Sequence, residues 1–104
     1  MVKELNEKEF YEKTKEGKVL VDFFATWCGP CKMLSPIIEE VSNIVSDYKF
    51  YKVDVDENEE LSEKYGIMSI PTLLIFENGN LKEKLVGFKT KEELLNLLKE
   101  WYYV

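Results

Sequence analysis

Residues 19–33 have the sequence VLVDFFATWCGPCKM, in which an apolar run is followed closely by two cysteines. The run at 19–25 is short, rich in branched and aromatic side chains and interrupted by one charge, which predicts a buried strand. From Met33 to Val45, apolar residues recur at helical spacing. We therefore expect Cys28 and Cys31 at the point where a strand turns into a helix.

A helix start is a favourable place for a cysteine thiolate. The first amide N–H groups of a helix have no partner within it, and the peptide dipoles place partial positive charge there. Free thiols titrate near about 8.5, whereas thiols in a C-x-x-C arrangement can fall to about 7. Such a fall stabilises the nucleophilic thiolate of Cys28 by roughly 2 kcal/mol. Pro30 suits an early helical position, and Gly29 leaves the approach of a disulfide unobstructed.

Three other interpretations of the cysteine pair are weaker. A disulfide that closes a ring of four residues contributes only about 2 kcal/mol in the loop-entropy model, so it would be a poor structural staple. Structural zinc takes four Cys or His ligands, whereas this chain has two cysteines and no histidine, so a metal site would need a bridged dimer. Inert core thiols do not explain the glycine, proline and tryptophan around them. Redox chemistry at Cys28 and Cys31, with no metal, is the favoured interpretation.

Length and composition indicate one small globular domain. The chain has 104 residues, of which 45% are apolar and 33% charged, so we expect a single domain over residues 1–104. A net charge of −6 weighs against nucleic-acid binding, which needs a basic surface. No apolar run approaches the ~18 residues of a membrane span, and the first residues lack the apolar core of a secretory signal. We therefore expect a reducing compartment, the cytoplasm, in which disulfides are transient and catalytic.

Capping and turn residues mark where the expected elements begin and end. Three expected helix starts have the sequence pattern of a capping box, at Asn6 with Glu9, Asp56 with Glu59, and Thr90 with Glu93. Asn78-Gly79 is a strong hairpin signal between two strands. The core face of the last helix is an apolar stripe made of Leu94, Leu97, Leu98 and Trp101.

Strands are predicted to alternate with helices along the chain. The predicted strands lie at 19–25, 50–55, 72–77 and 80–86, and the helices lie between 6 and 17, over 29–46, between 56 and 66, and from 90 onward. Alternation of this kind implies a parallel sheet covered on both faces, to which the hairpin adds an antiparallel part. The pattern therefore predicts a three-layer α/β sandwich.

The order and spacing of several segments resemble the thioredoxin family across essentially the whole chain. The matching segments are DFFATWCGPCKM at 22–33 followed by Pro36, KVDVD at 52–56, YGI at 65–67, IPT at 70–72 and VG at 86–87. A C-x-x-C pair alone is weak evidence, whereas W-C-G-P-C followed by I-P-T is a strong signal. The resemblance implies a thioredoxin fold, a central mixed sheet of four to five strands flanked by four helices, with residues 1–5 as a short edge strand.

The resemblance also implies a division of labour at the site. Cys28 would be the nucleophile, Cys31 the resolving cysteine, and Asp22 a buried acid–base that takes the proton of the second cysteine. From the residues alone, Asp22 either points out from a sheet face or lies buried under the helix, where desolvation would raise its pKa. Lys52 would lie near this aspartate and tune it, although it could also be an ordinary strand lysine.

A docking surface for substrates is implied by the same resemblance. The Ile70–Pro71 bond would be cis and would lie against the cysteines, leaving the backbone of Ile70 available to an extended substrate segment. We name as the docking surface the small apolar patch formed by Trp27, Gly29, Pro30, Ile70, Pro71 and Gly87. Such a patch, rimmed by acids, suits loose docking of many disulfide proteins.

These points together predict a general protein-disulfide reductase, a dithiol electron carrier. Its partners would be substrate proteins with disulfides and a thioredoxin reductase linked to a nicotinamide cofactor or ferredoxin, and the chain itself would bind no cofactor, nucleic acid or membrane and would be a monomer. One alternative is a disulfide oxidant or isomerase, although relatives of that kind favour a histidine between the cysteines. Another is a non-catalytic subunit that uses the fold as a binding scaffold.

Overall fold

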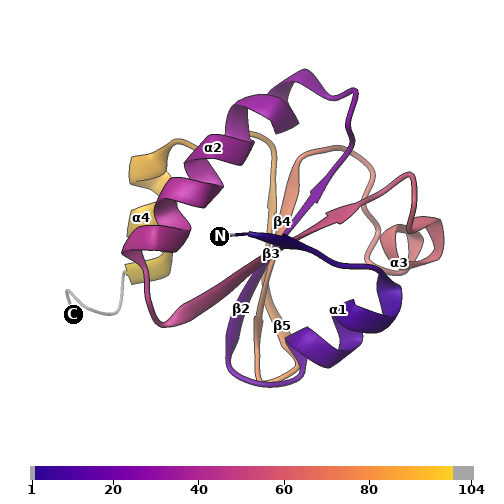
Figure 1. The fold of residues 1–104 in the computed structure, drawn as a ribbon, viewed down its shortest axis with the longest axis horizontal. Helices are drawn as coiled ribbons and strands as arrows, with labels where there is room; N and C mark the ends of the chain where they lie inside the picture. Colours follow the sequence, from indigo (N-terminus) through magenta and orange to yellow (C-terminus); the bar gives the residue numbers. More distant parts are fainter. Residues whose placement is uncertain (1, 100–104) are drawn as a thin grey trace.

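The computed structural model describes residues 2–99, in which helices and strands alternate as far as a final hairpin and helix (Figure 1). The strands are β1 (Lys3–Glu4), β2 (Lys18–Phe24), β3 (Tyr48–Asp54), β4 (Thr72–Glu77) and β5 (Asn80–Val86). The helices are α1 (Glu7–Thr14), α2 (Gly29–Ile44), α3 (Glu59–Lys64) and α4 (Lys91–Lys99). The five strands form one sheet in the order β1-β3-β2-β4-β5. Its β1, β3 and β2 strands are parallel, while β4 and β5 add the antiparallel part.

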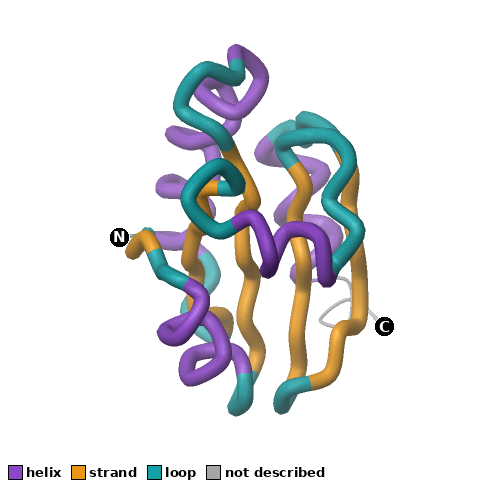
Figure 2. Tube along the Cα trace, turned by 90° about the vertical axis from the view of Figure 1, so that its right-hand side faces the viewer, coloured by secondary structure: helices purple, strands orange, loops and turns teal. Residues whose placement is uncertain are grey.

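Two apolar clusters hold one layer of helices on each face of the sheet. Leu34, Ile38 and Val41 of α2 join Leu94 and Leu98 of α4 in one buried cluster. Side chains of α1 and α3 belong to the other cluster, which lies on the opposite face. Figure 2 shows the strands side by side, with α1 and α3 in front of the sheet and α2 and α4 behind it. The predicted three-layer sandwich is confirmed.

Alternation along β2 decides which side chains reach the cysteine-bearing helix. Val21 and Phe23 are buried in the cluster on the α1 and α3 side, whereas Leu20 is buried with the side chains of α2. Because successive strand residues point to opposite faces, Asp22 shares the α2 face with Leu20. The carboxyl group of Asp22 therefore lies between the sheet and α2.

The predicted boundaries are close to the observed ones, and one predicted cap is wrong. The boxes at Asn6 and Thr90 are both formed, with reciprocal side-chain and backbone hydrogen bonds. The predicted box from Asp56 to Glu59 is not formed, because α3 begins one residue after Asn58 and has no side-chain cap. The β3 strand starts at Tyr48, two residues earlier than predicted, since its pairing with β2 already begins there.

The turn between β4 and β5 and the helix α4 test two further predictions. Asn78 and Gly79 both have positive φ, at 51° and 86°, as a tight hairpin between right-twisted strands requires. Leu94 and Leu98 are buried as predicted, Leu97 of the same predicted stripe is only half-buried, and Trp101 lies outside the described residues. No helix among residues 2–99 has the length and apolar character that crossing a membrane would require.

Candidate active site

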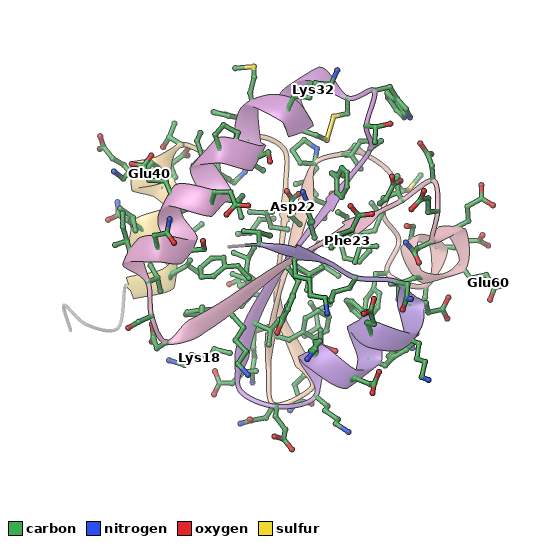
Figure 3. All side chains as sticks on the ribbon, in the orientation of Figure 1. Lys18, Asp22, Phe23, Lys32, Glu40 and Glu60 are labelled. Carbon is green, nitrogen blue, oxygen red and sulfur yellow. A yellow bond between two sulfur atoms is a disulfide. The ribbon has the colours of Figure 1, made fainter. Side chains whose placement is uncertain are left out.

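The two cysteines lie where β2 gives way to α2, as predicted. Cys28 is the N-cap residue of α2, and its sulfur accepts a hydrogen bond from the backbone N–H of Cys31 at 3.2 Å. Pro30 lies in the first turn, where its missing N–H leaves no helical hydrogen bond unmade. The cysteines form a disulfide, with their Cα atoms 5.2 Å apart, seen as the yellow bond at the start of α2 in Figure 3.

The surroundings of the dithiol favour negative charge on sulfur. The first turn of α2 carries no acidic residue, and the free N–H groups of a helix start point toward its N-cap. Both cysteines are nearly buried, in a small cluster with Ala25 against which Ile70 packs. A thiolate on Cys28 would be stabilised by the helix start, while its burial among apolar side chains opposes the charge.

The Ile70–Pro71 segment brings a second chain segment to the sulfur of Cys28. The Ile70–Pro71 peptide bond is cis, as the resemblance implied, and the carbonyl oxygen of Ile70 lies 3.7 Å from the sulfur of Cys28. The N–H of Gly87 donates to the carbonyl of Pro71 at 2.8 Å, so the end of β5 joins the start of β4 at the site. Four of the predicted site residues therefore meet here.

The side chain of Trp27 is held by Asp56, a residue that the sequence predicted to cap the third helix. Its side chain is 68% exposed, and its indole N–H donates to the carboxylate of Asp56 at 2.8 Å. The backbone N–H of Asp56 in turn donates to the carboxylate of Asp54 at 2.8 Å. One signal could have pointed to this pairing, because the carboxyl ends of parallel strands β2 and β3 meet at the same edge of the sheet.

The docking surface differs in exposure from one residue to the next. Trp27, Gly29 and Pro30 are exposed, Ile70 and Gly87 are half-buried, and Pro71 is buried. Four further apolar side chains close to these residues in sequence were not predicted to belong to the surface and are exposed: Met33, Met68, Val86 and Phe88. Met68, two residues before Ile70, is 94% exposed, which makes it the most exposed of these four.

Asp22 is buried under α2, which resolves the two possibilities left by the sequence. The residue is 4% exposed, and its Oδ1 atom has no hydrogen-bond partner within the described part of the chain. Burial raises the pKa of this carboxyl group from 3.8 to about 7, and the positive charge of Lys52 opposes the rise. Lys52 is the register partner of Asp22 on β3, and its ammonium group lies 5.5 Å from the centre of the Phe24 ring.

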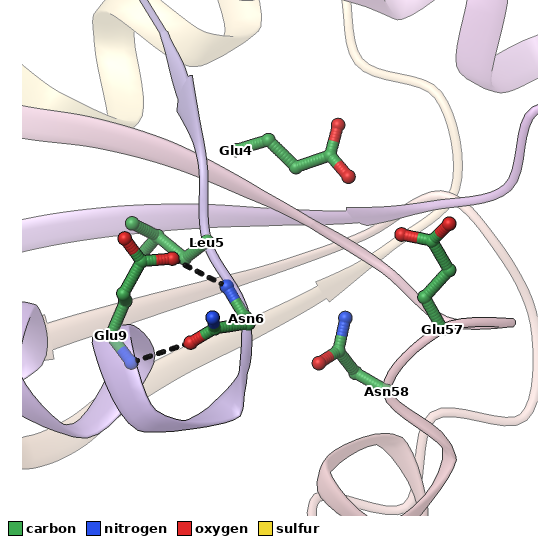
Figure 4. Close-up of a pocket in the computed structure, with 6 residues that line it drawn as sticks. All are labelled: Glu4, Leu5, Asn6, Glu9, Glu57 and Asn58. Atoms are coloured by element: carbon green, nitrogen blue, oxygen red, sulfur yellow. Dashed lines mark hydrogen bonds between the residues drawn. The ribbon is translucent and has the colours of Figure 1, made fainter.

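A group of acids lies around the carboxyl end of β3. Oxygen atoms of Glu4, Asp54 and Glu57 lie within 4.8 Å of one another, next to a pocket that is also lined by the first capping box (Figure 4). Asp54 already accepts the N–H of Asp56, and acids on a protein surface commonly lie together without a metal. We assign this group no part in the chemistry of the dithiol.

Comparison with known proteins agrees with the geometry. The thioredoxin family model matches residues 1–100. The chain is 52% identical over 93 residues to a thioredoxin of Bacillus subtilis, covering 88% of this chain and 89% of that protein. It is 46% identical over 102 residues to a thioredoxin of Listeria monocytogenes, covering 97% and 99%. A structure of Plasmodium falciparum thioredoxin superposes with a TM-score of 0.88 at 39% identity, over 96% of this chain and 99% of that one.

The likeness extends to the chemistry. A redox-active Cys28–Cys31 pair at the start of a helix, in a chain so similar to thioredoxins, identifies a dithiol–disulfide oxidoreductase that reduces protein disulfides. The chain belongs to the thioredoxin family.

Proposed function

We propose that this protein is a general reductant of protein disulfides in which Cys28 attacks and Cys31 resolves. The N-cap position of Cys28 carries the proposal, because the N–H of Cys31 and the helix start both stabilise a negative charge on its sulfur. The thiolate of Cys28 attacks one sulfur of a substrate disulfide, and the other substrate sulfur leaves. Cys31 then attacks the sulfur of Cys28, so the second substrate sulfur leaves and the enzyme is oxidised by two electrons.

The different surroundings of the two sulfurs support this order. The sulfur of Cys28 lies beside the carbonyl of Ile70, on the side of the docking surface. Cys31 instead lines an inner cavity together with Asp22. We therefore expect an incoming disulfide to meet Cys28 first, and Cys31 to attack from the side of the cavity.

Asp22 is the group that we propose as the base for Cys31. A carboxyl group with a pKa of about 7 can accept a thiol proton and release it again near neutral pH. Lys52 keeps this pKa from rising further, since its positive charge favours the ionised carboxylate. The side chain of Lys52 would thus tune the base and take no proton itself.

Substrates would dock on the surface formed by Trp27, Gly29, Pro30, Ile70, Pro71 and Gly87. The exposed ring of Trp27 supplies apolar contact area, and its hydrogen bond to Asp56 holds the ring in place. Pro71 has no backbone N–H, so the backbone of Ile70 is the group in this segment that an extended substrate chain would bind. Exposed Met68 adds an adaptable side chain of the kind used at promiscuous binding surfaces.

The oxidised enzyme would be reduced again by a thioredoxin reductase, which draws electrons from a nicotinamide cofactor or ferredoxin. We place the protein in the cytoplasm as a monomer of one domain, with disulfide-containing proteins as its other partners. Among the described residues, the polar groups gathered at the dithiol fit proton transfer and require no cofactor in this chain.

Trapping of substrates tests the assignment of the cysteines. We expect Cys31→Ser to accumulate covalent complexes with substrate proteins through Cys28, because the resolving attack is lost. Cys28→Ser should form none, and the reverse result would exchange the two roles. In an insulin-reduction assay with dithiothreitol, we expect a variant without both cysteines to be inactive. A protein that acted only as a binding scaffold would function equally well without them.

A further inference from the structure

A cavity of about 210 Å³ lies between the sheet and the first turns of α2, beside the resolving cysteine. Its lining comes from β2, the β2–α2 connection, β3 and α2, and consists of Asp22, Phe24, Ala25, Thr26, Cys31, Lys32, Ser35 and Lys52. Liquid water takes about 30 Å³ per molecule, so the cavity has room for several waters. None of its lining residues belongs to the docking surface, so a proton could leave through the cavity while a substrate is docked.

The carboxyl group of Asp22 borders this cavity and has an unsatisfied oxygen. Its Oδ1 atom is buried and has no hydrogen-bond partner among residues 2–99. A buried polar atom of this kind normally finds a protein group or an ordered water, and here the cavity supplies the room for water. The cavity therefore has room for a water that could hydrogen-bond to the carboxyl group of Asp22.

Of the polar side chains around the cavity, Ser35 is the best suited to hold such a water. The ammonium groups of Lys32 and Lys52 carry three N–H donors and no acceptor, so they can only donate hydrogen bonds. A serine hydroxyl both donates and accepts, as a proton relay requires. Ser35 is half-buried and follows Cys31 by four residues, which places both on one face of α2. Thr26 also carries a hydroxyl, but it is exposed at the rim.

Within residues 2–99, the hydroxyl of Ser35 is also not engaged elsewhere. Ser42, further along α2, donates to the carbonyl of Glu39 at 2.6 Å, and Ser62 of α3 donates to the carbonyl of Asn58 at 3.0 Å. No such bond is formed by Ser35 within the described residues. Its hydroxyl is therefore available to water in the cavity.

We propose that Ser35 is a positioning residue for the resolving step, whose hydroxyl holds the water through which Asp22 passes the proton of Cys31 to solvent. The inference rests on the proposed function, in which Asp22 is the base. Cys31 gives its proton to the carboxylate of Asp22, and its thiolate attacks the sulfur of Cys28. The bond from Cys28 to the substrate breaks, the substrate leaves as a thiolate, and Asp22 releases the proton through the cavity.

Reaction of the reduced protein with 5,5′-dithiobis(2-nitrobenzoate) separates the two steps. The first coloured thiolate is released when Cys28 attacks, and the second when Cys31 resolves the mixed disulfide. We expect Ser35→Ala to slow the second phase about three- to tenfold, as the loss of one hydrogen bond on a reaction path does, and to leave the first phase unchanged. Ser35→Thr keeps a hydroxyl and should restore the rate, and Ser42→Ala, a matched control on the same helix, should change neither phase.

Two further measurements separate a relay from a structural role. A small proton carrier such as imidazole should speed the second phase of Ser35→Ala and leave that of the unmodified protein unchanged. Combining Ser35→Ala with Asp22→Ala should slow the second phase no more than Asp22→Ala alone does. A second phase that is unchanged in Ser35→Ala, or slowed without rescue by imidazole, would overturn the role of Ser35.

The variant Asp22→Ala distinguishes this inference from the proposed function. If Asp22→Ala slows the second phase and Ser35→Ala does not, the base stands and the inference about Ser35 fails. If Asp22→Ala leaves the second phase unchanged, Asp22 is not the base, and both the proposed role of Asp22 and the inference about Ser35 are wrong.

Discussion

Replacement of Asp22 should stabilise the protein at neutral pH while slowing its chemistry. The carboxyl group is buried beside the uncharged Leu73 of β4, its register partner on that side, and Lys52 on β3 is its partner on the other. Burial raises its pKa from 3.8 to about 7. A carboxyl group whose pKa is raised by folding binds its proton more tightly in the folded state than in the unfolded one. The folded protein therefore loses stability as pH rises from 3.8 toward 7.

The size of the effect follows from the two pKa values. With the pKa raised from 3.8 to about 7, the linkage relation gives a destabilisation of about 4 kcal/mol at pH 7. The same relation gives about 2 kcal/mol at pH 5 and about 4 kcal/mol at pH 8, so the loss between these pH values is roughly 2 to 3 kcal/mol. Asp22→Ala removes the destabilisation caused by the buried carboxyl group but also loses some packing. We therefore expect the variant to be more stable than the natural protein by about 2 kcal/mol or more at pH 7.

Urea unfolding of the oxidised proteins at pH 5, 6, 7 and 8 measures this difference. Subtracting the natural protein from Asp22→Ala cancels the titration of groups that the substitution does not affect. The stability gap in favour of the variant should widen with pH, by roughly 2 to 3 kcal/mol over the range. Asp22→Asn is a matched control, because it also cannot ionise and should show the same widening from a different starting value. A gap that stays constant or narrows as pH rises would refute the reasoning.

Three further substitutions test single contacts of the site. Lys52→Met should raise the pKa of Asp22, because the opposing positive charge is lost, and a titration followed by the carboxyl ¹³C signal measures this pKa. An unchanged or lower pKa in the variant would mean that Lys52 does not influence Asp22. Asp56→Ala removes the acceptor of the Trp27 indole, so we expect stability to change by about 1 kcal/mol or less and the KM for insulin to rise; an unchanged KM would deny this hydrogen bond a part in docking. Gly87→Ala places a side chain at a φ of 94° with no atom within 4 Å of the added carbon, and urea unfolding should show a loss of about 1 to 2 kcal/mol from the backbone alone, whereas no loss would mean that the backbone relaxes.

The parts of the site that follow from periodicity could be predicted from the sequence. The apolar run before Cys28 and the helical spacing after Cys31 locate the dithiol at a helix start, and the structure confirms it. Alternation alone left open which face of the sheet Asp22 would point to. The face is decided by the helices that cover it, since the strand is buried on both sides.

Contacts between distant loops could not be predicted in the same way. Asp56 has the spacing of a capping residue, yet α3 begins beyond Asn58 and the carboxylate of Asp56 is left to bind Trp27. This outcome depends on where two segments meet, 29 residues apart in sequence; the parallel pairing of β2 and β3 brings their ends to one edge of the sheet but does not say which side chains bind there. The cavity beside Ser35 results from the packing of α2 on the sheet. It could not be predicted from the sequence, because a serine four residues after Cys31 also fits an ordinary exposed helix face.

The reduction potential of the Cys28–Cys31 pair tests the central claim most directly. Equilibration with dithiothreitol or glutathione buffers, followed by alkylation of free thiols, gives the potential. A reductant of protein disulfides with this dithiol should have a potential near about −270 mV, the value of thioredoxin. A potential of about −180 mV or higher, in the range of disulfide isomerases and oxidants, would contradict the assignment of this protein as a reductase.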